Sequence, residues 1–333
     1  MGGPCTDFER LSEPLGLRTL RAPRTLTPAP MASPRPGSEP GSTRALTPGF
    51  TGRPRSTGLL FALLLALPVL VGVGYAVAGS MGFAGAGARG LTGAPWVRVL
   101  ADGGVHAGIV WTLWIAAAST ALSTAVAVAL AVAFRGGGRL DGAARVMALL
   151  PLPIPHLVAA VCGVLILGQS GILARAGAQL GLVSVPADMP ALVADPWGVG
   201  LIAALTWKEI PFLALVAFSI LATRGKQLEE AARTLGAGPL ATFRHVTWPV
   251  LWLGMLPAVV AVFTFVAGSW EAAVLLAPSN PLALPLQIME RHTDPALARR
   301  GDAFVLVLVA LALAALAVAL HERLRARWQV LER

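Results

Sequence analysis

Six long apolar segments constrain the fold of this chain more than any other feature of its sequence. Because the apolar core of a bilayer is about 30 Å thick, a helix needs about 20 residues to cross it. Only 13% of the 333 residues are charged, whereas soluble domains carry about 25%. The sequence therefore predicts an all-α integral membrane protein with six transmembrane helices. The segments lie at about 59–79, 107–133, 147–168, 198–222, 250–277 and 303–320.

The distribution of Lys and Arg predicts which loops face the cytoplasm, because short loops rich in these residues stay on that side. With the N-terminus inside, nineteen of the 26 basic residues fall on the inner side and six on the outer side. They form no run or stripe of the kind that binds nucleic acid, so we expect no nucleic-acid partner. We expect a multi-pass protein of the cell (inner) membrane with both termini in the cytoplasm.

The two ends of the chain differ from its apolar middle. Residues 1–57 are rich in Pro, Arg, Ser, Thr and Gly, and such a stretch buries too little apolar surface to offset its ordering entropy. We predict a disordered cytoplasmic tail there, a membrane domain over residues 58–325 and a second cytoplasmic tail over residues 326–333. The sequence leaves open whether translation starts at Met1 or at Met31.

The loop between the fourth and fifth apolar segments, residues 224–249, contains a pattern that predicts two short helices. Good helix-forming residues run over 228–235. Gly236 then offers the left-handed geometry that ends a helix, and Pro239 suits the first turn of a second helix.

The first of these short helices carries residues suited to docking another protein. Ala231 and Ala232 give it a small, shallow face that another backbone can approach closely, while Glu230 and Arg233 can form charged contacts at its edge. The distribution of basic residues assigns this loop to the cytoplasm. We expect it to transmit force from a soluble partner to the membrane helices.

The spacing of Glu230, Ala231, Ala232, Gly236 and Pro249 resembles the EAA loop of binding-protein-dependent ABC importer permeases. In that family this loop is the coupling helix, which docks in a groove of the ATP-binding subunit and moves when ATP binds and is hydrolysed. The resemblance implies that these five residues couple the chain to an ATPase. It also implies a type I ABC importer permease architecture, with a cytoplasmic coupling-helix loop between helices 4 and 5.

The resemblance extends over about residues 59–320. The stretch 149–171, with its early prolines, is similar to the third span of these permeases. The stretch 268–276, GSWEAAVLL, is similar to the branch that carries polyamines, thiamine, ferric iron and related small solutes, and this resemblance implies a solute of the polyamine, thiamine or ferric-iron class. Val246 and Trp248 depart mildly from the family, which more often has isoleucine and leucine at these positions.

The resemblance also implies partners. These are a dimer of ABC ATP-binding subunits, a second permease subunit and a periplasmic or lipid-anchored substrate-binding protein, all assembled in membrane lipid. The chain has no GxxxxGK[ST] loop, and its five histidines lack metal-ligand spacing. We therefore expect no catalytic residue, metal or cofactor in this chain, with ATP bound and hydrolysed by a partner. The solute, and whether the second permease is a copy of this chain or a related one, stay open.

Four residues are candidates for the translocation path: Lys208, Glu209, Trp270 and Glu271. An ionisable group in the middle of a span costs about 3 kcal/mol on insertion scales, so it usually faces a cavity or a partner. Lys208 and Glu209 point about 100° apart, and each is expected to have its own partner. A path role and a structural pairing between helices are equally open for them. For Trp270 and Glu271 the alternatives are an outer gate and an interfacial anchor.

Two other classes of function stay open from the sequence. A secondary transporter driven by an ion gradient would use Lys208 and Glu209 as its coupling site. A membrane scaffold or receptor would carry the EAA-like loop by coincidence. The fixed spacing, the glycine, the proline and the cytoplasmic placement together favour the ABC permease.

Overall fold

Helices form all the regular structure in the part of the chain that the computed structural model describes, residues 55–85, 90–136 and 138–331. The longest are α3 (Gly103–Ala133) and α13 (Arg300–Leu331), with 31 and 32 residues. The other helices, in chain order, are α1 (Arg55–Ser80), α2 (Ala94–Ala101), α4 (Arg139–Leu149), α5 (His156–Leu167), α6 (Ile172–Gln179), α7 (Val199–Ile220), α8 (Lys226–Thr234), α9 (Pro239–Thr242), α10 (Trp248–Ala267), α11 (Trp270–Leu276) and α12 (Leu284–Thr293). Two π-helical segments are η2 (Leu221–Gly225) and η3 (Phe243–Thr247), and two short 3₁₀ turns are η1 (Pro186–Asp188) and η4 (Leu297–Arg299).

Six helical stretches are long and apolar enough to cross a membrane, and each overlaps one of the six predicted segments. The prediction of an all-helical fold with six spans is thereby confirmed. The stretches are Gly58–Ser80, Gly103–Ala133, His156–Gln179, Val199–Thr223, Pro239–Ala267 and Leu297–Ala326.

The third span begins later than predicted. The predicted segment starts at residue 147, but the apolar helix α5 begins only at His156. Pro151, Pro153 and Pro155 each lack the N–H that a helix needs and disfavour the α conformation at the residue before them. The chain makes turns there, so the prolines separate α4 from α5.

The fifth predicted span, 250–277, consists of two helices rather than one. α10 ends at Ala267, and α11 begins at Trp270. Ser269 between them has an extended backbone, with φ −74° and ψ 107°, and Gly268 has a low intrinsic preference for helix. The residues predicted for the outer end of this span therefore lie on a separate short helix.

Helical structure reaches further at both ends of the chain than predicted. α1 starts at Arg55, inside the predicted N-terminal tail, and α13 continues to Leu331, through most of the predicted C-terminal tail. The rest of both predicted tails, residues 1–54 and 332–333, lies outside the described residues.

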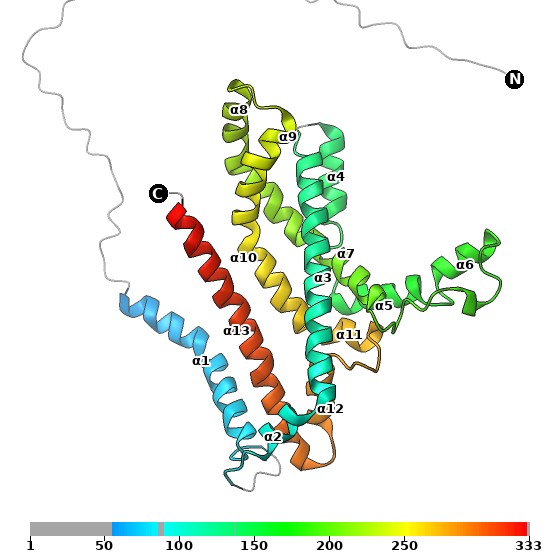
Figure 1. Ribbon diagram of the computed structural model, residues 1–333, viewed down its shortest axis with the longest axis vertical. Coiled ribbons are helices and arrows are strands. Elements are labelled where there is room, and N and C mark those ends of the chain that lie inside the picture. Colours follow the sequence, from blue (N-terminus) through cyan, green and yellow to red (C-terminus); the bar gives the residue numbers. More distant parts are fainter. Residues whose placement is uncertain (1–54, 86–89, 137, 332–333) are drawn as a thin grey trace, which may run out of the picture. The chain divides into compact units, whose positions relative to one another are not determined.

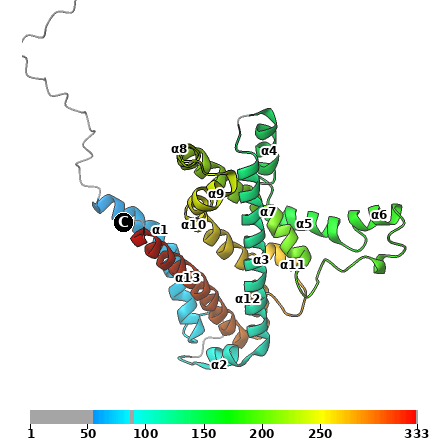
Figure 2. The ribbon, with the colours of Figure 1, turned by 45° about the horizontal axis from the view of Figure 1, so that its top comes forward.

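The centre of the bundle is formed by α3, α7 and α10, which pack against one another (Figures 1 and 2). Ala116, Ala127 and Ala131 of α3 are fully buried, as are Leu213 and Ala217 of α7. Small side chains let membrane helices approach closely. The alanines of α3 therefore explain why this helix packs most extensively against α7.

The bundle has two distinct ends, which Figure 1 shows clearly. α4, α8 and α9 lie at one end of the central helices, here called the α8–α9 end. α2 and α12 lie at the opposite end, here called the α2–α12 end. The last turns of α13 point toward the α8–α9 end.

Candidate functional site

The loop at the α8–α9 end has the two short helices that the sequence predicts. α8 ends in a Schellman motif: the N–H of Ala237 bonds the carbonyl of Ala232 at 3.0 Å, and the N–H of Gly236 bonds the carbonyl of Arg233 at 3.0 Å. Gly236 has φ +85°, a left-handed conformation that glycine adopts without strain. Pro239 is the first residue of α9.

The predicted coupling residues lie mostly on the outside of this loop. Glu230 and Ala231 of α8 are exposed, Ala232 is half-buried, and Gly236 is exposed at the helix end. Pro249 is half-buried in the first turn of α10, so it does not belong to the same helix as the other four. The exposed side of α8 is available to a soluble partner.

Glu229, which no sequence pattern singled out, is the buried acidic residue of α8. Its side chain points into the bundle, and the residue is only 7% exposed. Its Oε1 accepts a hydrogen bond from Thr247 Oγ1 at 2.6 Å and an ion-paired hydrogen bond from Arg135. The one signal in the sequence is its place directly before Glu230, which turns it about 100° around the helix.

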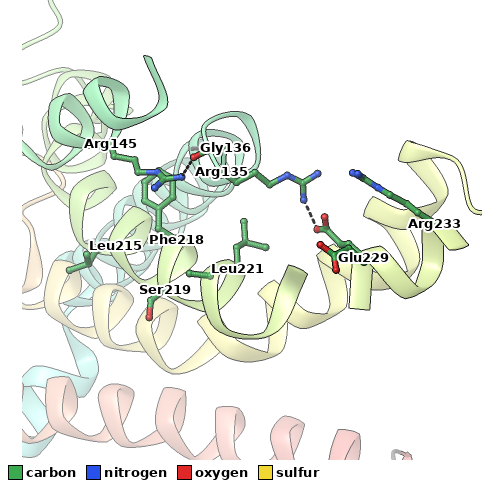
Figure 3. A pocket seen from close by; sticks show the side chains of 11 residues that line it. Arg135, Gly136, Arg145, Leu215, Phe218, Ser219, Leu221, Glu229 and Arg233 are labelled. Atoms are coloured by element: carbon green, nitrogen blue, oxygen red, sulfur yellow. Dashed lines mark hydrogen bonds and ion pairs between the residues drawn. The ribbon is translucent and has the colours of Figure 1, made fainter. Parts of the chain in front are cut away.

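A cavity of about 650 Å³ opens beside Glu229, between the end of α3, α4, α7 and α8 (Figure 3). Arg145 of α4 projects over the ring of Phe218, 5.3 Å from its centre. The guanidinium donates to the carbonyls of Phe134 at 2.9 Å and Gly136 at 2.6 Å. Arg145 therefore satisfies the carbonyl of Phe134, the C-cap of α3, and that of Gly136 in the turn that follows.

Lys208 and Glu209 lie in the middle of α7, and each is 6% exposed. Glu209 Oε1 lies 3.1 Å from His156 Nε2, and Lys208 Nζ donates to the carbonyl of Leu152 at 3.3 Å. The structure thus gives each charge its own partner, as expected. Both partners come from the proline-rich segment 151–156, which the two charges join to α7.

Trp270 and Glu271 form the first turn of α11, which packs against α5 and α7. Trp270 is exposed and Glu271 is half-buried. Within the described part of the chain, no hydrogen bond or ion pair joins them to Lys208 or Glu209. The structure therefore separates the four candidate path residues into two groups.

The α2–α12 end is held by several polar contacts. Arg98 of α2 donates through Nη2 and Nε to Asp302 of α13, at 2.6 and 3.1 Å. Arg291 of α12 donates to Asp102 at 2.6 Å. Gln287 of α12 donates to the carbonyl of Gly104 at 3.0 Å. These contacts join α2, the start of α3, α12 and α13.

The comparisons with known proteins agree with one another. Residues 123–330 match the family model described as "Binding-protein-dependent transport system inner membrane component". The chain is 31% identical over 201 residues to the molybdenum transport system permease protein ModB of Mycobacterium bovis, a match that covers 59% of this chain and 72% of ModB. It is 27% identical over 235 residues to the sulfate transport system permease protein CysW of Synechocystis sp., covering 69% of this chain and 81% of CysW.

The fold is similar to that of a solved bacterial transporter. The similar chain belongs to an alginate ABC transporter in complex with an alginate pentasaccharide-bound periplasmic protein. The TM-score is 0.61 at 18% sequence identity, with 82% of this chain and 95% of the other covered. At this identity the likeness concerns the fold alone.

Proposed function

The chain belongs to the family of binding-protein-dependent transport system inner membrane components and is a multi-pass permease subunit of an ABC importer, and from this premise we propose that it is driven by a separate ATPase through α8. The observation that carries the proposal is the exposed face of α8, which holds Glu230 and Ala231. Small side chains there let a partner's backbone approach closely, and Glu230 supplies a charged contact. ATP is bound and hydrolysed by that partner.

Gly236 and Pro249 do not belong to the exposed face of α8, but they fix the ends of the helices around it. Gly236 ends α8 in a left-handed turn, which sets the angle between α8 and α9. Pro249 lies in the first turn of α10, where its fixed φ suits a helix start. Ala232, half-buried beside the exposed face, completes the set of five coupling residues in this proposal.

Co-purification tests the ATPase partner. A tagged wild-type chain, extracted from its own host membrane in mild detergent, is expected to retain an ABC ATP-binding subunit. Glu230→Lys is expected to lose it, because the substitution reverses a charge on the docking face. Glu290→Lys is the matched control, since Glu290 is exposed on α12 at the opposite end. Equal retention by both variants would contradict docking at α8.

The assembly in this proposal also holds a second permease subunit, a substrate-binding protein and membrane lipid. The alginate transporter that resembles this chain is named for a complex with a periplasmic protein, which supports a binding-protein partner. The last turns of α13 point toward the α8–α9 end (Figure 1), which supports a cytoplasmic C-terminus on the side of the ATPase. Labelling of single cysteines with a membrane-impermeant maleimide in intact cells tests both termini.

The four candidate path residues have two different roles in this proposal. Lys208 and Glu209 pair within the chain and hold the segment 151–156 against α7. Trp270 and Glu271, at the start of α11, take the outer-gate role. Glu271→Gln is then expected to change the uptake rate while the protein accumulates normally. Glu209→Gln is expected to lower the amount of protein in the membrane. A Glu209→Gln chain that reaches normal amounts but imports less solute would instead assign Glu209 to the translocation path.

The solute in this proposal is a tetrahedral oxyanion such as molybdate or sulfate, supported by the names of the relatives ModB and CysW. Cells that lack the gene, compared with complemented cells, are expected to take up less radiolabelled molybdate or sulfate. Thiamine, putrescine and ferric iron belong in the same panel, because the resemblance of residues 268–276 points to that branch. A defect restricted to one of these three would replace the oxyanion.

Energy source separates an ABC permease from a secondary transporter. Uptake is expected to require the ATPase subunit and ATP, and to persist when ionophores collapse the ion gradients while ATP is maintained. Uptake by the reconstituted chain alone, driven by an ion gradient, would contradict the proposal.

A further inference from the structure

Glu229 and Glu230 are neighbours on α8 with opposite surroundings. Glu230 is exposed, whereas Glu229 is 7% exposed and bonded to two other elements. Both residues line the cavity of about 650 Å³, but the Glu229 carboxylate is held by Arg135 and Thr247. We therefore expect the two residues to have different roles.

The bonds of Glu229 reach residues at the ends of two central helices. Arg135 closely follows α3, and Thr247 directly precedes α10. Both donate to the same carboxylate oxygen, Oε1, with Thr247 Oγ1 at 2.6 Å. Hydrogen bonds to a charged carboxylate are about twice as strong as neutral ones. One side chain thus ties α8 to the ends of two central helices.

The chain itself connects α8 to these helices less firmly. η2, a π-helical segment, precedes α8, and the left-handed Gly236 follows it. A second π-helical segment, η3, lies between α9 and α10. π-helical turns interrupt the regular α-helical bonding pattern and recur at functional sites. α7, η2 and α8 follow one another without a break, so a push on α8 reaches α7 along the chain. α3 has no such connection to α8, and a side-chain contact supplies one.

We propose that Glu229 is a positioning residue that clamps α8 to α3 and α10, so that a movement of α8 imposed by the ATPase is transmitted to both spans. This inference rests on the proposed function. The clamp consists of Glu229, Arg135 and Thr247. It holds α8 through the buried Glu229, while the ATPase docks on the exposed surface of α8 that includes Glu230 and Ala231.

If Glu229 acts as this clamp, its substitution leaves ATPase docking intact and lowers the solute imported per ATP hydrolysed. In Glu229→Gln, the ATPase subunit is expected to co-purify with the chain in wild-type amounts and to hydrolyse ATP in proteoliposomes. Solute imported per ATP hydrolysed is expected to fall about fivefold or more, the lower end of ordinary coupling between sites. Glu290→Gln is the matched control, because Glu290 is exposed on α12 at the opposite end, and it is expected to change neither ATPase binding nor this ratio.

Charge exchange keeps the test decisive if Glu229→Gln fails to fold. Glu229→Arg alone places two cations together and is expected to abolish uptake, whereas Glu229→Arg with Arg135→Glu is expected to restore part of the solute-to-ATP ratio. Thr247→Val, which removes one donor and keeps the shape, is expected to lower the ratio less than Glu229→Gln. A purely structural role would lower the amount of protein and its ATPase activity together and leave the ratio unchanged.

The outcomes distinguish this inference from the proposed function. The probe is radiolabelled molybdate, or the solute of the uptake panel that the wild type imports. A wild-type chain that retains no ATPase overturns the proposed function and the clamp with it. A wild type that couples normally, together with a Glu229→Gln chain of unchanged solute-to-ATP ratio, overturns the clamp alone.

Discussion

The two ends of the bundle are joined in different ways. At the α2–α12 end, the pairs Arg98–Asp302 and Arg291–Asp102, together with the Gln287 contacts, join helices from the start and the end of the chain. At the α8–α9 end, α8 is joined to its neighbours through Glu229, beside a cavity of about 650 Å³. Both π-helical segments of the described residues flank the α8–α9 loop.

The difference suggests where the molecule can move. Elements that move in a functional cycle come from the less stable parts of a structure. A cavity lies at each end, of about 650 Å³ beside α8 and about 550 Å³ beside α2. The ends differ in that π-helical turns flank the α8–α9 loop, whereas a network of polar contacts joins the helices of the α2–α12 end. Force is therefore expected to enter at the more deformable end, and the α2–α12 end is expected to respond as one unit.

The largest predicted effect tests how closely the α2–α12 end is packed. In Gly108→Ala, the new Cβ would lie 2.3 Å from the backbone oxygen of Leu282 and 2.1 Å from Gln287 Nε2. Backbone atoms cannot move aside cheaply, so we expect the free energy of unfolding to fall by about 2–3 kcal/mol. Thermal unfolding of the purified chain measures this. Gly103→Ala is the control, because nothing lies within 4 Å of the place its new Cβ would take; equal melting temperatures would mean that this end is not closely packed.

The second prediction removes the ion pair of the α2–α12 end whose carboxylate is buried, Arg98–Asp302. Asp302 is 5% exposed and accepts hydrogen bonds from both Nε and Nη2 of Arg98. Asp302→Asn keeps the shape and loses the charge, so the unfolding free energy is expected to fall by about 1.5 kcal/mol. Asp294→Asn is the control, since its partner Arg299 is 64% exposed and exposed pairs contribute about 0.5 kcal/mol. Equal losses in the two variants would show that burial of Asp302 adds nothing.

Features of this fold that depend on neighbouring residues could be predicted from the sequence, whereas contacts between distant residues could not. The six spans and the two short helices are predictable because apolar length, glycine and proline act locally. The break at Ser269 was missed because it lies within an apolar run. The late start of α5 was missed although Pro151, Pro153 and Pro155 signal it locally. Glu229 was missed for a different reason. Its partners, Arg135 and Thr247, lie 94 and 18 residues away, and no local pattern in a single sequence encodes such a contact.

The third prediction concerns the α8–α9 end. Arg145→Met keeps an unbranched stem but removes the guanidinium that caps the carbonyls of Phe134 and Gly136. Water in the adjacent cavity can replace part of these bonds, so the expected loss of unfolding free energy is about 1 kcal/mol. Arg139→Met, an exposed substitution on the same helix, is expected to change nothing. If Arg145→Met lowered the unfolding free energy more than Asp302→Asn does, the α8–α9 end would be the more firmly held of the two ends, contrary to the comparison above.

The smallest prediction concerns Asp102, which precedes the second span. Burial by itself raises the pKa of this carboxyl, but the hydrogen bond from the Gly104 N–H and the Arg291 guanidinium outweigh it, so the pKa lies below the ordinary 3.8. Because the folded pKa is the lower one, the stabilisation is present above about pH 4 and is lost as the pH falls through the folded pKa. The side chain is 41% exposed, so the effect is expected to stay under about 1 kcal/mol and to shrink with salt. Melting temperatures between pH 6 and pH 3 should fall slightly less for Asp102→Asn than for the wild type, and identical slopes would show that this pair does not help to hold the α2–α12 end.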